Sequence, residues 1–104
     1  MNINQPLNDV YRTAPELSGF DRLTWAVTGL CQEAGEVAGV FSKLTWPDGH
    51  IGMSVTPESW KDELGDTLWY LAQVAECLGL TLEDIWNFNQ AKLEKRFGPN
   101  HREV

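Results

Sequence analysis

Apolar residues recur at intervals of three and four positions over two long stretches of this chain, and this spacing restricts the fold. The first stretch begins with Ser18 or Asp21 as a helix cap and runs to about Leu44. Its apolar residues step by four and three without a break: Leu23, Val27, Leu30, Ala34, Val37, Phe41 and Leu44. This period is typical of a helix packed lengthwise against others. At about 1.5 Å per residue the helix is ~38 Å long, so it needs a partner of similar length.

The second long helix is predicted from Pro57 to about Leu78. Thr56 is a suitable cap, Pro57 suits the first helical position, and Gly79 ends the helix. Its main stripe is Trp60, Leu64, Leu68, Leu71, Ala75 and Leu78, and further apolar residues lie elsewhere on its circumference: Trp69, Tyr70, Ala72 and Val74. A helix that is apolar over so much of its circumference is buried on several sides, and one chain of 104 residues has too few helices to cover it. We therefore predict an all-α antiparallel hairpin, completed as a bundle by homo-oligomerisation.

Two shorter helices are predicted around this hairpin, within a single domain over residues 1–104. Residues 4–12 form the first one. The other begins at Thr81, with Asp84 completing a capping box, and ends at Gly98-Pro99. Its stripe is Leu82, Trp86, Asn89, Leu93 and Phe97, which includes one polar residue. The long helices are joined by residues 45–56, a loop long enough to favour a functional role.

Two acidic motifs of the same form lie on the two long helices. They read Glu33-Ala34-Gly35-Glu36 and Glu63-Leu64-Gly65-Asp66. Acids at i and i+3 share one side of a helix. One such pair is ordinarily a solvated face, whereas two pairs on antiparallel helices can converge. Converging carboxylates repel one another, and a divalent cation removes this repulsion; ligands that are all oxygen suit Mg²⁺ or Mn²⁺.

By their spacing, Glu33 and Glu36 should lie on the flank of the first apolar stripe, where ligands that face a neighbouring helix would lie. Gly35 and Gly65 can also serve simply to let the helices approach. The remaining helix acids are assigned to the surface: Asp62, Glu76, Glu83 and Glu94.

Charge and cysteine content restrict the partners. A formal charge of −7 and a pI near 4.6 disfavour a protein that binds the nucleic-acid backbone, so polyanionic substrates would enter with metal ions. Cys31 and Cys77 lie in apolar helical patterns and are predicted to be buried free thiols, with a disulfide as the less favoured alternative. The first residues lack the basic and apolar regions of a signal peptide, and no apolar run is long enough to span a membrane. Cytoplasm is the expected location.

The combined pattern resembles the MazG-type nucleoside triphosphate pyrophosphohydrolases, a group of all-α enzymes. Their pattern is Glu-Glu-x-x-Glu, a spacer, then Glu-x-x-Asp. The similarity runs from about Leu23 through the second helix and into Asn89-x-x-Lys92-Leu93-x-x-Arg96-Phe97. It implies Mg²⁺-dependent (or Mn²⁺-dependent) hydrolysis of nucleoside triphosphates, foremost dNTPs, to the monophosphate and pyrophosphate, as nucleotide-pool house-cleaning. It also implies a homodimer or a dimer of dimers, without a nucleic-acid polymer or membrane as partner.

The resemblance also assigns site residues. Glu33, Glu36, Glu63 and Asp66 match the metal-ligand and catalytic positions, while Gln32 replaces the family's leading acid and cannot act as a base. The predicted substrate contacts are Asn89, Lys92, Arg96, Tyr70 and Trp46. Each has a structural alternative: Asn89 can fix the packing register, cations suit a helix end, and aromatic residues usually serve packing.

Two other functions remain open from the sequence. One is a catalytically weak dimeric helical module that binds nucleotide or protein, which Gln32 favours. The other is a related enzyme that acts on phosphoribosyl-ATP or a different nucleotide.

Overall fold

The described part of the chain is entirely helical in its regular structure. The computed structural model describes residues 2, 10, 12–44 and 56–98, with helices α2 (Gly19–Leu44), α3 (Pro57–Cys77) and α4 (Leu82–Phe97). The prediction of an all-α fold is confirmed for these residues, and the three helices begin and end within a few residues of their predicted bounds. Most of the predicted helix over 4–12 and most of the loop over 45–56 lie outside the described residues. No described helix is long and apolar enough to cross a membrane.

Local side-chain chemistry fixes where α3 and α4 begin and end. Thr56 and Thr81 each accept a hydrogen bond from the backbone N–H three residues later, at 3.3 and 3.0 Å. The Asp84 carboxylate accepts one in return from the Thr81 N–H, at 3.2 Å. Gly79 and Gly98 follow the two helices with φ of 69° and 84°, a left-handed backbone that only glycine adopts at little cost. These caps were readable in the sequence because they depend on neighbours in the chain.

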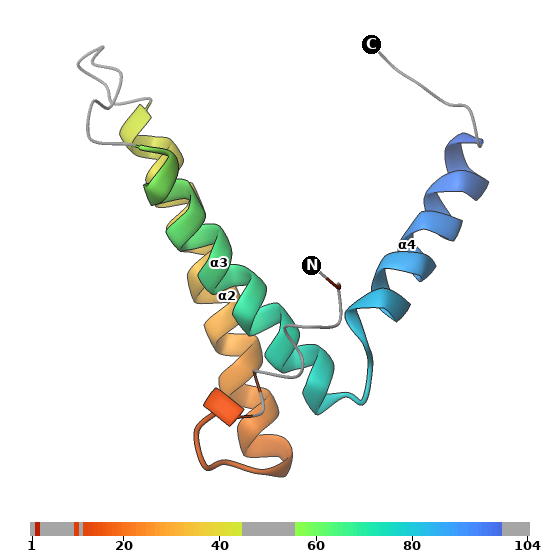
Figure 1. Cartoon of the computed structure of the whole chain (residues 1–104), viewed down its shortest axis with the longest axis horizontal. Helices are drawn as coiled ribbons and strands as arrows, with labels where there is room; N and C mark the ends of the chain where they lie inside the picture. The colour runs from red at the N-terminus through yellow and green to blue at the C-terminus, as the bar shows by residue number, and fades with distance from the viewer. Residues whose placement is uncertain (1, 3–9, 11, 45–55, 99–104) are drawn as a thin grey trace.

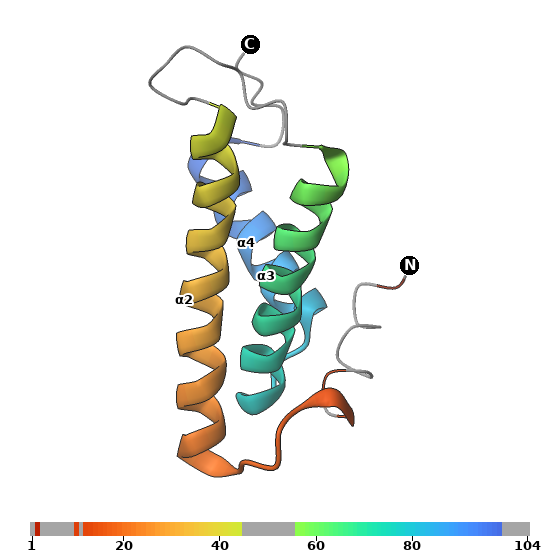
Figure 2. The same cartoon turned by 90° about the vertical axis from the view of Figure 1, so that its left-hand side faces the viewer.

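Helices α2 and α3 form an antiparallel hairpin, seen side by side in Figures 1 and 2. Their contacts come in layers along the hairpin, pairing Arg22 with Glu76, Gly29 with Tyr70 and Glu33 with Asp66. Each layer is one helical turn or two from the next. The register of the hairpin is therefore fixed along most of its length.

The face that α2 turns toward α3 differs from the predicted one. The facing residues are Arg22, Ala26, Gly29, Glu33 and Val40, one position before the predicted apolar stripe. On that stripe Val27 and Phe41 remain 42% and 57% exposed. Within this facing set Gly29 leaves the space that the Tyr70 ring of α3 occupies. Glu33 lies beside the predicted stripe, as its spacing predicts, and from there it faces α3.

A buried polar network ties the start of the described chain to α3. Arg22 donates to the Gln73 side-chain oxygen at 2.8 Å and forms an ion pair with Glu76. The Gln73 amide donates to the Val10 carbonyl at 3.0 Å, and Gln73 is fully buried. The prediction that Glu76 is surface charge was wrong: it is half-buried and neutralises a buried guanidinium.

Cys31 and Cys77 are free, as predicted, but they are not both buried. Cys31 is exposed and Cys77 is half-buried. Cys31 lies two residues beyond Gly29, about 200° around the helix, so it projects from the side of α2 opposite α3. The apolar pattern around Cys31 could not show which side of α2 would be covered.

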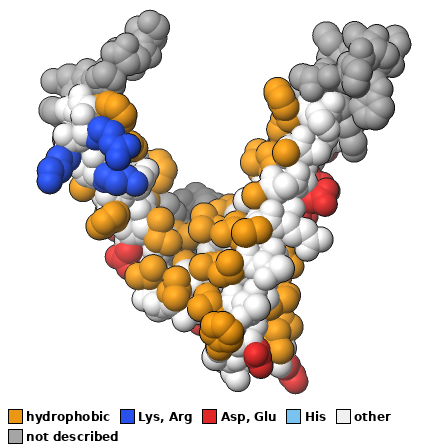
Figure 3. All heavy atoms as spheres, turned by 180° about the vertical axis from the view of Figure 1, so that it is seen from behind, with side chains coloured by type: hydrophobic (Ala, Val, Ile, Leu, Met, Phe, Trp, Pro, Cys, Tyr) orange, Lys and Arg blue, Asp and Glu red, His pale blue; other side chains and the backbone are white. Residues whose placement is uncertain are grey.

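Helix α4 diverges from the hairpin, so that the described elements form two arms (Figure 1). Between α3 and α4 lies a groove of about 430 Å³, lined by Leu68, Leu71, Leu82, Ile85, Trp86, Phe88, Asn89 and Lys92. Figure 3 shows apolar side chains over the inner faces of both arms and Lys and Arg side chains toward the far end of α4. Much apolar surface is thus left uncovered within one chain.

We expect Gln73→Leu to lower the free energy of unfolding by about 2 kcal/mol, because the Val10 carbonyl and the Arg22 guanidinium each lose a buried hydrogen-bond partner. Urea unfolding followed by circular dichroism measures the change. Gln90→Leu, at an exposed position of α4, is the matched control and should change stability by less than about 0.5 kcal/mol. Equal effects of the two substitutions would contradict a stabilising role for the network.

Candidate metal centre

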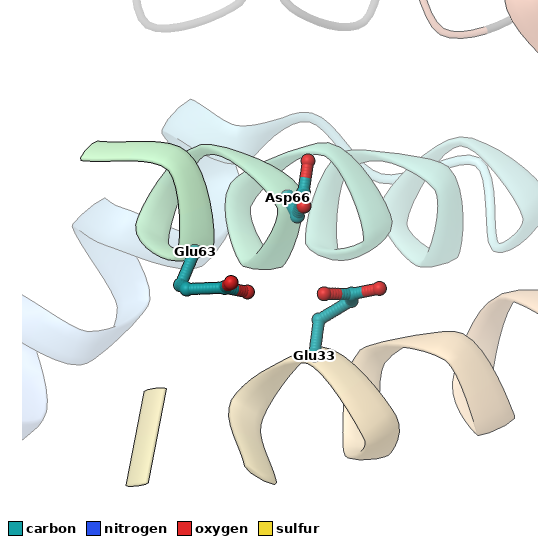
Figure 4. Close-up of side chains that lie close together, drawn as sticks. All are labelled: Glu33, Glu63 and Asp66. Atoms are coloured by element: carbon teal, nitrogen blue, oxygen red, sulfur yellow. The ribbon is translucent and has the colours of Figure 1, made fainter. Parts of the chain in front are cut away.

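Three carboxylates from two helices meet between α2 and α3. Glu33 comes from α2, and Glu63 and Asp66 come from α3 one turn apart; one oxygen of each lies within 4.8 Å of the others. Figure 4 shows Glu33 and Glu63 pointing into the space between the helices, with Asp66 one turn along α3. The antiparallel register produces this meeting, since it places the two acidic motifs opposite each other.

Glu36, the fourth predicted ligand, lies at the edge of this cluster. Its side chain is exposed, and its carboxylate is not among the three that lie within 4.8 Å of one another. Its charge nevertheless contributes to raising the pKa of both Glu33 and Glu63. The structure therefore brings three of the four predicted acids together and leaves Glu36 close enough to act electrostatically.

The electrostatics of the cluster are those of crowded like charges. Partial burial, followed by the charges of Asp66, Glu36 and Asp62, raises the pKa of Glu33. Partial burial also raises the pKa of Glu63, with Asp62 as the largest charge effect. A raised carboxyl pKa means that the folded protein disfavours the ionised form, so the ionised cluster opposes folding until a cation neutralises it.

Asp62, which was predicted to be surface charge, also contributes to the electrostatics of the cluster. It is exposed, as predicted, yet its charge acts on Glu33 across the hairpin as well as on its neighbour Glu63. Its spacing of four residues from Asp66 was a signal in the sequence, because residues at i and i+4 share a helix face.

The donor set fits a hard divalent cation. All three side chains offer oxygen. Zinc prefers histidine and cysteine ligands, and none of these within residues 12–44 and 56–98 joins the group. In an octahedral Mg²⁺ site with oxygens at about 2.0–2.1 Å, adjacent ligands lie roughly 2.9 Å apart and opposite ligands roughly 4.2 Å apart. The three oxygens lie within 4.8 Å of one another, so they would have to move closer together around a bound Mg²⁺.

An aromatic layer lies one turn from the carboxylates. The Tyr70 ring packs against Gly29 and lies 5.2 Å from the Trp25 ring and 4.9 Å from the Trp69 ring, between centroids. This packing places Tyr70 next to the acids, as its spacing from Asp66 predicts. Its predicted contact with substrate stays a prediction.

The predicted substrate contacts of α4 lie apart from the cluster within one chain. Asn89 is half-buried and Lys92 is exposed, and both line the groove between α3 and α4. Arg96 is exposed, with its guanidinium carbon 6.0 Å from the centroid of the Phe97 ring. Within the described residues, neither cation forms an ion pair with the cluster. Trp46, the remaining predicted contact, falls outside the described residues.

The fold and the cluster together define an all-helical protein with a carboxylate site of the composition that divalent cations prefer. Comparison with protein families makes this specific: a model of the MazG nucleotide pyrophosphohydrolase domain matches residues 23–100. The chain belongs to this family, as the acidic motifs predicted. The match spans both acidic motifs and all of α4. Nucleotide pyrophosphohydrolase activity, typically dependent on a divalent metal, is the general chemistry of the family.

A phage protein is also similar. The Gene 37 protein of Mycobacterium phage L5 is 30% identical over 87 residues, which are 84% of this chain and 76% of the phage protein. Its name states no activity. No solved structure matches the chain at a significant level.

We expect Glu33→Gln to stabilise the metal-free protein and to weaken its Mg²⁺ binding by about tenfold or more, because the substitution removes one of the crowded charges and one anionic ligand. Melting temperatures measured in EDTA and in a Mg²⁺ titration test both parts. Glu94→Gln, which removes an exposed charge on α4, should change neither property. A melting temperature in EDTA that falls in Glu33→Gln would contradict the repulsion.

Proposed function

We propose that this protein is a cytoplasmic, Mg²⁺-dependent nucleoside triphosphate pyrophosphohydrolase that converts dNTPs to the monophosphate and pyrophosphate as a house-cleaning reaction. The observation that carries the proposal is the meeting of Glu33, Glu63 and Asp66 between α2 and α3. The family match supports the reaction class. The choice of Mg²⁺, with Mn²⁺ as a substitute, rests on the oxygen-only donor set.

In this proposal the carboxylates hold the cation and orient the substrate. Glu33, Glu63 and Asp66 would hold the cation, and Glu36 at the edge of the cluster would be the further carboxylate available to it. When bound, the cation offsets the charge of the triphosphate and activates water for attack. An acidic chain would otherwise repel a polyanion, so the triphosphate enters with its charge partly neutralised.

Attack occurs at the α-phosphorus. A bond forms between the water oxygen and this phosphorus, and the bond to the bridging oxygen breaks so that pyrophosphate leaves. The proton of water passes to a base and from there to solvent. Gln32 is exposed next to Glu33, and its amide can orient a water molecule but cannot accept the proton as a base. A carboxylate of the cluster is therefore the candidate base.

We also propose that the enzyme is a homodimer or a dimer of dimers in which a second copy covers the apolar stripes. Val27 and Phe41 on α2, and Leu64 and Leu68 on α3, are each at least 40% exposed. The two arms also differ in charge: α4 carries Lys92, Lys95 and Arg96, whereas the hairpin carries the acidic cluster.

This charge difference favours a second copy of the chain as the occupant of the groove, because an isologous dimer can place the basic end of each α4 near the acids of its partner. Asn89, Lys92 and Arg96 would then contact the substrate phosphates across the interface. Asn89 and Lys92 both line the groove, and Lys92 is the one of these two that carries a positive charge for the phosphates.

The alternative is a catalytically weak module that binds nucleotide or a partner protein. Gln32 at the position of the family's leading acid favours this alternative, because one acid that could assist water activation is missing. Nucleotide binding without turnover would distinguish it from the enzyme.

A panel of nucleotides assayed with Mg²⁺ should yield monophosphate and pyrophosphate, with dNTPs as the preferred substrates. Asp66→Asn should reduce kcat by about a hundredfold or more, because it removes an anionic ligand from the charge-stabilising cluster. Glu83→Gln, an exposed acid at the start of α4, is the control. Orthophosphate as the product, or wild-type activity in Asp66→Asn, would refute the proposal, and binding without turnover would favour the alternative.

Sedimentation should show a dimer or tetramer for the wild type and smaller species for Leu68→Glu, because the glutamate places a charge in the apolar groove. Gln90→Glu, an exposed position on the same protein, should leave the assembly unchanged.

If Lys92 acts across the interface, mixing inactive Asp66→Asn and Lys92→Ala chains should restore roughly a quarter of the activity, since half of the dimers are mixed and each has one intact site. A monomeric wild type of full activity would contradict this assembly.

A further inference from the structure

One layer of the hairpin brings the α2 backbone and an α3 side chain into unusually close approach. A Cβ atom built on Gly29 would lie 2.0 Å from Tyr70 Cε1 and 2.4 Å from its Cδ1. The other hairpin glycines inside the two helices, Gly35, Gly39 and Gly65, have nothing within 4 Å of such an atom. Of these glycines, Gly29 is the one whose missing side chain the packing requires.

This contact lies directly beside the carboxylates. Gly29 precedes Glu33 by four residues on α2, and Tyr70 follows Asp66 by four residues on α3. Because the helices are antiparallel, the Gly29–Tyr70 pair and the Glu33–Asp66 pair occupy adjacent layers, about 6 Å apart along the hairpin. A helix does not bend appreciably over one turn, so the separation of the helices in one layer is imposed on the next.

The Tyr70 ring, which is half-buried, also packs against two indole rings. Trp25 and Trp69 lie 5.2 and 4.9 Å away between ring centroids, and these two indoles contact each other at 5.6 Å in an edge-to-face arrangement. Gly29 itself is buried. A methyl group at position 29 would therefore push the helices apart or displace a ring that has little room to move.

We propose that the contact between Gly29 and Tyr70 sets the separation of α2 and α3 at the carboxylate cluster and thereby selects the size of the divalent cation that the cluster accepts. Tyr70 is a positioning residue in this role. The inference rests on the proposed metal-binding function of Glu33, Glu63 and Asp66.

Cation size gives the selection its physical basis. Mg²⁺ requires oxygens at about 2.0–2.1 Å in near-ideal octahedral geometry, whereas Ca²⁺ takes them at about 2.3–2.6 Å in flexible geometry. Carboxylates held on two opposing helices cannot all follow a widening of a few tenths of an ångström toward a small ion. A wider hairpin therefore loses Mg²⁺ binding before it loses Ca²⁺ binding.

The experiment compares Mg²⁺, Mn²⁺ and Ca²⁺ affinities of the nucleotide-free full chain by isothermal titration calorimetry. Gly29→Ala should weaken Mg²⁺ binding by about tenfold and Ca²⁺ binding by about threefold or less, so that the affinity ratio moves toward the larger ion. Gly39→Ala places the same methyl group on the same helix where nothing is within 4 Å, and it should leave the ratio unchanged. If Gly29→Ala lowers the melting temperature but leaves the ratio of Mg²⁺ to Ca²⁺ affinity unchanged, the contact only stabilises the fold and the proposal is wrong.

Substitutions at Tyr70 change the same contact from the other helix, and they test the proposal even if Gly29→Ala does not fold. Tyr70→Phe keeps the ring and should keep the ratio, whereas Tyr70→Leu removes the ring and should shift the ratio toward the smaller ion. The double variant Gly29→Ala/Tyr70→Leu has room for the methyl group, so its ratio should return toward that of the wild type.

The failures can be told apart. A wild type that binds no divalent cation overturns the proposed function and this inference with it. A wild type that binds Mg²⁺, together with unchanged ratios in Gly29→Ala and Tyr70→Leu, overturns this inference alone.

Discussion

Repulsion among the carboxylates between α2 and α3 is the unfavourable interaction that the rest of the hairpin has to offset. Glu33, Glu63 and Asp66 face one another from α2 and α3, and the nearby charges of Glu36 and Asp62 add to the repulsion. Left alone, these charges would push the two helices apart. The hairpin must therefore be held together by contacts elsewhere along its length, and a bound cation would convert the repulsive layer into a cohesive one.

Those holding contacts lie on one side of the acidic layer, toward the start of α2. The Gly29–Tyr70 layer comes first, and the buried Arg22 network with Gln73 and Glu76 follows two turns further. Arg22 is a cation paired with one carboxylate and one amide, so this end of the hairpin is electrostatically satisfied. The hairpin thus has a neutralised polar layer near the start of α2 and, separate from it, an anionic layer at Glu33, Glu63 and Asp66.

The most apolar stripes of α2 and α3 do not pack against each other. Within the hairpin α2 uses small and polar residues against α3, while Val27, Phe41 and Leu64 stay exposed. A large apolar surface kept free on two helices, beside an arm that carries the cations, is the arrangement expected of a chain that completes its core by association. The buried core of the described residues is correspondingly small and consists of Val10, Ala72, Ala75 and Leu82.

The sequence by itself determined the helices, their caps and the acidic pairs, because each depends on residues three or four apart. Thr56, Thr81 and Gly79 act through neighbours in the chain, and the spacing of Glu63 and Asp66 fixes their shared side. Only the tertiary structure decided which of two adjacent stripes on α2 faces α3, because the stripes differ by one residue and both have helical period. That choice brought Glu33 into the interface, made Glu76 a partner of Arg22, exposed Cys31 and gave Gly29 its contact with Tyr70. Pairing across the hairpin joins residues about thirty or more positions apart in the chain, as in Glu33–Glu63 and Gly29–Tyr70, and no local pattern encodes such a contact.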